Sequence, residues 1–174
     1  MTKITDKIEI VKGDITKLKV DAIVNAANKS LLGGAGVDGA IHQAAGPQLV
    51  KACRKLHGCE TGEAKMTRGY KLPAKYVIHT VGPKYYETSD TQATKLLIAC
   101  YQNSLDLARL NHLHSIAFPA ISTGVYFFPA AKAAKIAYQT VKQYLTDHQD
   151  YDLKVILCAY DKKTADLYHA QAVQ

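Results

Sequence analysis

The chain has 174 residues, of which 48% are hydrophobic and 21% charged. This composition is ordinary for a globular protein, and the length fits one domain over residues 1–174 with a sizeable core. No apolar run approaches the roughly 20 residues of a membrane span, and the first residues lack the apolar segment of a secretory signal, so a cytoplasmic protein without membrane contact is expected. The net charge of +7 favours partners that carry phosphate or other negative charge, although the lysines are dispersed and form no dense basic block.

The four cysteines include no Cys-x-x-Cys pair. Cys100 falls in a helical pattern and Cys158 in an apolar strand pattern, so both are expected to be reduced core residues. Cys53, His57 and Cys59 lie close together, but no second half of a zinc pattern follows them. The sequence therefore predicts no metal site.

Hydrophobic periodicity predicts strands and helices that alternate along the chain. In chain order, the expected elements are strands over 8–11 and 22–24, helices over 37–45 and 47–57, strands over 64–68 and 76–81, a helix over 90–111, a strand over 115–119, a helix over 130–148, a strand over 153–158 and a helix over 163–173. This order indicates a layered α/β fold with a largely buried sheet. Ligands of such folds bind in a crevice at the carboxyl ends of the strands.

The most informative segment runs from Asn25 to His42 and reads NAANKSLLGGAGVDGAIH. It leads from a buried strand through polar amides into a glycine-rich loop and then into a helix. Glycines let backbone N–H groups approach a ligand, and a helix N-terminus attracts phosphate. Asp38 lies at the same helix end, where it would repel an anion. A carboxylate in that place indicates chemistry or orientation rather than affinity alone.

Three other classes of site fit the sequence less well than this segment does. Residues 34–39 formally match the G-x-G-x-x-G of dinucleotide enzymes, but residues 27–32 separate them from the strand that should directly precede them, and Glu60 follows a helix rather than a strand. The P-loop pattern of nucleotide triphosphatases is absent from the sequence. Ser122 lies in Ile-Ser-Thr-Gly rather than G-x-S-x-G, which disfavours a serine nucleophile.

A second glycine-bearing loop, residues 120–129, also follows a predicted strand and precedes a helix. Its small residues can present N–H groups to an anion, and its aromatic residues can form a wall beside a sugar or base. Because both loops follow strands of one sheet, we expect them to meet at a single crevice.

With Gly-Asp-Ile-Thr at 13–16, these loops make the chain resemble the macro domain family, and within it the MacroD-like hydrolase branch. The resemblance covers nearly the whole chain. Its further motifs are Val-Asn-Ala-Ala-Asn at 24–28, Gly-Gly-Ala-Gly-Val-Asp-Gly-Ala-Ile-His at 33–42, Ala-Ala-Gly-Pro at 44–47, His-Thr-Val-Gly-Pro at 79–83 and Phe-Pro-Ala-Ile-Ser-Thr-Gly-Val-Tyr at 118–126. It implies a three-layer macro domain fold, with a mixed and largely parallel sheet flanked by helices.

The resemblance also implies roles for individual residues. Asp14 should accept a hydrogen bond from the adenine amine of ADP-ribose, assisted by the backbone of Ile15. Asn28 and Asp38 should face the distal ribose as catalytic residues, and His42, one helical turn after Asp38, should orient that carboxylate. The other implied ligand-binding residues are Gly34, Ala35, Gly36, Val37, Gly39, Ser122, Thr123, Gly124, Val125, Tyr126, Phe127 and Phe128.

One aromatic position of the two loops matches the family pattern, and two other positions depart from it. Phe128 matches the family aromatic residue that stacks near the distal ribose. Ala35 stands where this branch usually has a third consecutive glycine, and Phe127 replaces a usual glycine. These two departures bear more on turnover than on ligand binding. Asn25 is interpreted as a buried scaffold residue, and His79 as a core histidine with satisfied hydrogen bonds.

The sequence therefore predicts a monomeric macro domain that binds ADP-ribose and removes it from acidic side chains of ADP-ribosylated proteins, with deacetylation of O-acetyl-ADP-ribose at the same site. Water held between a phosphate oxygen and Asp38 would be directed at the distal ribose, and no cofactor or metal is required. Two alternatives stay open, namely a reader that binds ADP-ribose without hydrolysis and an RNA-binding regulatory module.

Overall fold

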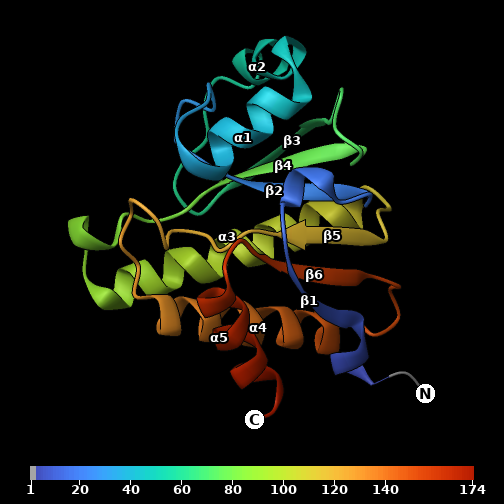
Figure 1. The fold of residues 1–174 in the computed structure, drawn as a ribbon, viewed down its shortest axis with the longest axis vertical. Helices are drawn as coiled ribbons and strands as arrows, with labels where there is room; N and C mark the ends of the chain where they lie inside the picture. Colours follow the sequence, from blue (N-terminus) through green and yellow to red (C-terminus); the bar gives the residue numbers. More distant parts are fainter. Residues whose placement is uncertain (1–2) are drawn as a thin grey trace.

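The computed structural model describes residues 3–174, so residues 1 and 2 of the predicted domain lie outside the described part. Its centre is a sheet of strands in the order β1-β6-β5-β2-β4-β3 (Figure 1). The strands are β1 (Ile8–Lys12), β2 (Ala22–Ala27), β3 (Ala64–Arg68), β4 (Tyr76–Val81), β5 (Ser115–Phe118) and β6 (Lys154–Ala159). The β3 strand runs antiparallel to β4, and all other pairs are parallel.

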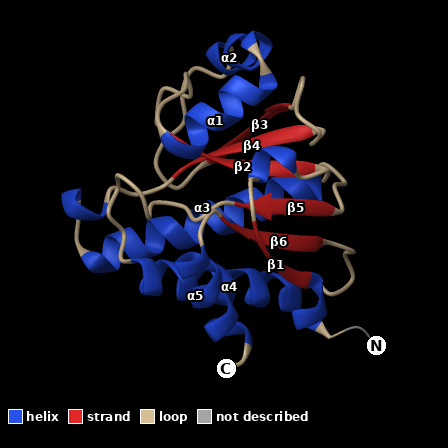
Figure 2. Cartoon of the chain, in the orientation of Figure 1, coloured by secondary structure: helices blue, strands red, loops and turns tan. Residues whose placement is uncertain are grey.

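Helices cover both faces of this sheet (Figure 2). They are α1 (Gly36–Ala45), α2 (Pro47–Arg54), α3 (Asp90–Leu110), α4 (Ala130–Asp147) and α5 (Lys162–Ala172), with short 3₁₀ turns η1 (Ile4–Lys7), η2 (Ile15–Lys17) and η3 (Tyr85–Glu87). The α1 and α2 helices lie on one face, and α3, α4 and α5 lie on the other. The predicted three-layer α/β fold with a mixed, largely parallel sheet is confirmed.

The central strand β2 is buried on both faces, which explains its nearly continuous apolar sequence. Val24 belongs to the core beneath α3 and α4, whereas Ile23 and Ala27 belong to the core beneath α1 and α2. Since successive side chains of a strand point to opposite faces, Asn25 faces the α1–α2 layer with Ile23 and Ala27. It is fully buried there.

Most predicted ends agree with the structure to within one residue, but two predicted elements end about three residues away from their predicted ends. The helix predicted over 47–57 ends at Arg54, because His57 adopts a left-handed backbone with φ of 57° that cannot continue a helix. The strand predicted over 22–24 continues to Ala27. Asn25 is tolerated inside that strand because its amide has buried hydrogen-bond partners.

The parallel strands place four chain segments at one edge of the sheet. Gly13 follows β1, Asn28 follows β2, Gly82 follows β4 and Pro119 follows β5. Because parallel strands share the direction of their carboxyl ends, the two glycine-bearing loops meet at this edge, as the sequence predicts.

All four cysteines are buried free thiols within the described part of the chain. Burial raises the pKa of Cys53, Cys100 and Cys158 to about 11 and also raises that of Cys59. Within residues 3–174, no cluster of His, Cys, Asp and Glu is arranged to hold a metal, and no helix is long and apolar enough to span a membrane.

Candidate functional site

The loop after β2 is held in shape by the side chain of Asn28. Its Nδ2 atom donates a hydrogen bond of 2.9 Å to the carbonyl oxygen of Gly33. Its Oδ1 atom accepts bonds from Oγ of Ser30 at 2.7 Å and from the backbone N–H of Leu31 at 3.1 Å. An Asn amide carries two N–H groups, so the second one remains for a ligand.

Glycines allow this loop to pass between the two predicted catalytic side chains. A Cβ atom on Gly34 would lie 3.1 Å from Oδ2 of Asp38 and 3.4 Å from Nδ2 of Asn28. A Cβ atom on Gly39 would lie only 2.5 Å from the carbonyl oxygen of Gly34. Asn28 and Asp38 therefore flank one strip of backbone.

The first turn of α1 offers backbone donors at this strip. The N-cap residue is Ala35, which makes no side-chain capping bond in the described structure. Gly36 begins the helix with φ of 61°, and its missing side chain would meet nothing within 4 Å among the described residues, so the conformation rather than crowding favours glycine there. Orphan N–H groups at a helix N-terminus are well suited to a phosphate group.

Asp38 is buried at this helix end. Its Oδ1 atom accepts a 2.9 Å hydrogen bond from Nδ2 of Asn25, and Nε2 of His42 lies 3.4 Å from the same oxygen. Burial raises the pKa of the Asp38 carboxyl, while the Asn25 bond and the nearby His42 ring act in the opposite direction. A carboxylate with a raised pKa is a better general base than an ordinary one. The geometry is consistent with the orienting role predicted for His42.

The loop after β5 is a tight turn that packs against the end of β4. Ser122 has φ of 66°, and its carbonyl oxygen accepts a 2.9 Å bond from the N–H of Phe128. The N–H of Phe127 donates a 3.0 Å bond to the carbonyl of Gly124. A Cβ atom on Gly82 would collide with Oγ of Ser122. The glycine at the end of β4 thus permits the close approach of this loop.

A cavity of about 310 Å³ lies between residues 28–30 after β2, the segment after β4 and Tyr126 of the 120–129 loop. Its lining includes Asn28, Gly82, Lys84 and Tyr126. The ammonium group of Lys84 lies 5.6 Å from the centre of the Tyr126 ring. Glu87 also lines the cavity and pairs with Lys84 at 3.8 Å. The cavity thus presents an amide, an ion pair and an aromatic wall, groups that can bind the hydroxyls and the face of a sugar.

The structure differs from the prediction for Phe128. Its side chain is only 2% exposed and packs against Tyr85, with ring centroids 4.9 Å apart. A ring enclosed in the core has no free face for a ribose, so Phe128 supports the loop from below. Tyr126 is instead the aromatic residue at the cavity beside Asn28. Phe127 is 70% exposed and lies at the rim.

Asp14 is the N-cap residue of η2 and is separated from the end of β1 by Gly13. Its Oδ1 atom accepts bonds from the N–H and the hydroxyl of Thr16 at 2.9 and 2.7 Å. The bond from the Thr16 hydroxyl has the larger effect and the bond from the Thr16 backbone N–H the smaller one, and both lower the pKa of the exposed Asp14 carboxyl. Asp14 is therefore an oriented, ionised hydrogen-bond acceptor, and Ile15 beside it is buried.

The remaining predicted ligand-binding residues lie in the two loops. Val37 packs against the core under α1, the hydroxyl of Thr123 donates to the carbonyl of Ala120 at 3.2 Å, and Val125 is 71% exposed. Gly124 has open space where a side chain would be, among the described residues.

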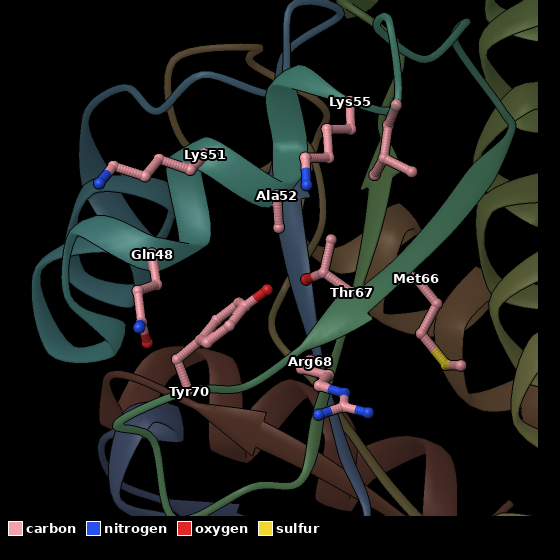
Figure 3. Close-up of a pocket in the computed structure, with 9 residues that line it drawn as sticks. Gln48, Lys51, Ala52, Lys55, Met66, Thr67, Arg68 and Tyr70 are labelled. Atoms are coloured by element: carbon pink, nitrogen blue, oxygen red, sulfur yellow. The ribbon is translucent and has the colours of Figure 1, made fainter.

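A second hollow, of about 390 Å³, lies between α2 and β3 (Figure 3). Its lining includes Lys55, Thr67, Arg68 and Tyr70, and the Tyr70 hydroxyl points toward its middle. Arg68 of this hollow pairs with Tyr76 at the beginning of β4. The two glycine-bearing loops instead follow the ends of the parallel strands, so they lie at the other edge of the sheet. Sequence reasoning missed this hollow because its residues come from separate segments with no common pattern.

An α/β domain with two anion-accepting loops, a buried carboxylate at a helix N-terminus and an acidic acceptor after β1 has the features of a nucleotide-derivative-binding protein. Residues 24–137 match the macro domain family. The chain belongs to the macro domain family.

Close relatives support this membership. A macro domain-containing protein of Chlorobaculum tepidum, CT2219, is 56% identical over 92% of both chains. The ADP-ribose glycohydrolase MACROD1 of Bos taurus is 53% identical over 95% of this chain and 51% of its own length, so the chain spans about half of that relative.

Solved structures agree with the fold. A variant of the Oceanobacillus iheyensis macrodomain with ADPR has a TM-score of 0.88 at 46% identity, covering 94% of this chain and 90% of that one. The Trypanosoma brucei macrodomain in complex with ADP-ribose also has a TM-score of 0.88, at 42% identity over 94% of this chain and 68% of that one.

Proposed function

We propose that this protein binds ADP-ribose and hydrolyses mono-ADP-ribose from acidic side chains of proteins, and that the same site deacetylates O-acetyl-ADP-ribose. The observation that carries the proposal is the placement of a buried carboxylate, Asp38, across one strip of glycine backbone from Asn28. The bovine relative named ADP-ribose glycohydrolase MACROD1, 53% identical, supports it.

The site has a place for each part of ADP-ribose. Asp14 receives the adenine amine. The N–H groups at the start of α1 and in the 122–126 turn receive the diphosphate. The cavity lined by Asn28 and Tyr126 receives the distal ribose. Such a pose brings Asp38 close to a phosphate oxygen and to the ribose, so binding also positions the reacting groups.

In the proposed reaction, a water molecule is held between Asp38 and a phosphate oxygen of the substrate. Its oxygen attacks the anomeric carbon of the distal ribose, the bond from that carbon to the ester oxygen breaks, and the acidic side chain leaves as a carboxylate. The proton from water passes to Asp38 or to the phosphate. Fixed donors in a partly enclosed cleft stabilise the charge that develops on the leaving group.

The deciding experiment uses a mono-ADP-ribosylated acceptor protein and follows release of ADP-ribose. We expect release by the wild-type protein and a large loss of release in Asp38→Ala. Tight ADP-ribose binding without release by the wild-type protein would instead identify a non-catalytic reader. RNA binding is distinguished by salt, because RNA affinity falls steeply with ionic strength and ADP-ribose affinity falls much less.

The cellular setting is part of the same proposal. The buried free thiols support a reducing compartment such as the cytoplasm. Size-exclusion chromatography with light scattering tests the expected monomer.

A further inference from the structure

A line of buried and partly buried polar side chains runs along one face of the sheet, from β3 across β4 and β2 to α1. Oγ1 of Thr67 on β3 lies 2.9 Å from Nε2 of His79 on β4. Nδ1 of the same ring lies 3.2 Å from Nδ2 of Asn25 on β2. Nδ2 of Asn25 also lies 2.9 Å from Oδ1 of Asp38 on α1. We call these four residues the Thr67–Asp38 chain.

The strand register explains how the Thr67–Asp38 chain forms. Asn25 and His79 are direct partners in the β2–β4 pairing, and both are fully buried. His79 shares its face of the sheet with Val77 and Val81, which belong to the core beneath α1 and α2. The two polar side chains therefore meet under the helix that carries Asp38.

The count of protons fixes the direction of every bond. One N–H of the Asn25 amide points to the Asp38 carboxylate, and the other points to Nδ1 of His79, so Nδ1 must be an acceptor. The ring proton then resides on Nε2 and is donated to Thr67. Burial lowers the pKa of His79 to about 3, which agrees with a neutral ring.

The opposite orientation of the Asn25 amide would be unfavourable. It would place Oδ1 of Asn25 against a carboxylate oxygen of Asp38, where two acceptors repel each other. In the observed orientation, Oδ1 of Asn25 has no hydrogen-bond partner among the described residues. The orientation of the Asn25 amide therefore satisfies its N–H donors, which face Asp38 and His79, and leaves its buried oxygen unpaired.

We propose that Asn25 and His79 are positioning residues for the reaction at Asp38. His79 fixes the direction of the Asn25 amide, and Asn25 fixes Oδ1 of Asp38, which leaves Oδ2 beside Gly34 and facing the ligand. This inference rests on the proposed hydrolase function. It predicts that loss of either residue impairs turnover more than ligand binding.

Two substitutions of His79 separate the proposed role from simple core packing. His79→Asn keeps an acceptor close to the place of Nδ1, whereas His79→Gln places its polar group nearer the place of Nε2 and loses the acceptor for Asn25. We expect kcat for release of ADP-ribose to fall about 10- to 100-fold in His79→Gln and in Asn25→Ala, but only a few-fold in His79→Asn. The Kd for ADP-ribose should stay within about threefold in all of them.

Thr80→Val is the matched control, because Thr80 is also buried on β4 and donates its hydroxyl to the carbonyl of Glu63, outside the Thr67–Asp38 chain. It should lower the melting temperature and leave kcat unchanged. Equal kcat values for His79→Asn and His79→Gln would overturn the proposal. A fall of kcat in Thr80→Val in proportion to its loss of stability would also overturn it, because kcat would then follow stability alone.

Nitrogen NMR of the wild-type protein gives a readout that needs no turnover. We expect His79 to be a neutral ring with its proton on Nε2, and Asn25→Ala to weaken that preference. A proton on Nδ1 in the wild-type protein would overturn the inference. Absence of any ADP-ribose release by the wild-type protein would instead refute the proposed function. The tautomer of His79 would still test the proposed directions of the hydrogen bonds.

Discussion

The ring of Phe127 meets the ring of Tyr86 edge to face, with centroids 6.0 Å apart and planes inclined by 67°. This pair connects the 120–129 loop to η3 at the rim of the site. Edge-to-face aromatic contacts are favourable, but both rings are largely exposed, at 70% and 59%. Phe127 also has φ of 58°, a left-handed conformation that costs a non-glycine residue about 1–2 kcal/mol.

Phe127→Gly and Phe127→Ala separate the effect of the ring from that of the backbone. Both remove the aromatic contact, but only glycine relieves the left-handed strain, so Phe127→Gly should be more stable than Phe127→Ala by about 1 kcal/mol. If the ring covers the bound ribose, both variants should release ADP-ribose faster and favour modified protein over O-acetyl-ADP-ribose. Thermal melts and stopped-flow dissociation measure these effects. Equal dissociation rates in all three proteins would show that the ring stays away from the ligand.

Asp38→Asn should reduce turnover about 10²- to 10⁴-fold, because the amide cannot take a proton from water. The Kd for ADP-ribose should change little or decrease, since a negative charge beside the diphosphate is removed. Single-turnover release and calorimetry on the same preparation measure both quantities. Near wild-type release by the variant would exclude Asp38 from catalysis.

The same variant should be more stable than the wild-type protein at neutral pH. Burial raises the pKa of Asp38 above its ordinary value of 3.8, so the folded state holds the proton more tightly than the unfolded state. This contribution to stability is complete below pH 3.8 and is lost as pH rises through the folded-state pKa. The stability advantage of Asp38→Asn should therefore grow between pH 3 and pH 7 in denaturant titrations. A constant difference across this range would contradict the raised pKa.

Asp14→Ala should weaken ADP-ribose binding about 10- to 100-fold, since a hydrogen bond to a charged acceptor is worth about 1.5–3 kcal/mol. The preference for adenine over hypoxanthine analogues should also shrink. Thr16→Val is the control that keeps the carboxylate and removes one bond that orients it, so its loss should be smaller. Calorimetry with both ligands decides the matter, and unchanged affinity in Asp14→Ala would remove this residue from the site.

Gly39→Ala should destabilise the protein by about 1–3 kcal/mol and weaken ADP-ribose binding. The new methyl group would press on the carbonyl oxygen of Gly34, a backbone atom that cannot rotate away. Gly124→Ala is the matched control for stability, because at that position the methyl group meets nothing within 4 Å among the described residues. Similar losses of stability in the two variants would argue against a specific clash at Gly39.

Secondary structure and fold class were predictable because the elements have regular hydrophobic periods and are bounded by glycine and proline. The sequence did not make it predictable which aromatic residue of the 120–129 loop lies at the cavity. Phe127 has left-handed backbone, which changes the direction of the chain, so Tyr126 lies at the cavity and Phe128 enters the core. No period in the sequence encodes that change.

The partnership of Asn25 with His79 was also beyond the sequence, although both were expected to be buried. Their side chains meet because of the register between β2 and β4, across a separation of 54 residues. Register depends on how the whole sheet packs, and a shift by one residue would turn each side chain to the other face.

The four buried thiols give this protein an internal reporter of its own unfolding. A thiol with a pKa of about 11, as in Cys53 and Cys100, is almost entirely protonated at neutral pH and is shielded from reagents. Modification by a thiol-specific dye therefore requires the structure to open first. Sγ of Cys53 lies 3.7 Å from Nε2 of His79, so the labelling rate of Cys53 reports the opening of α2 over the face of the sheet that carries His79. Cys100, inside α3, reports the opposite face of the sheet.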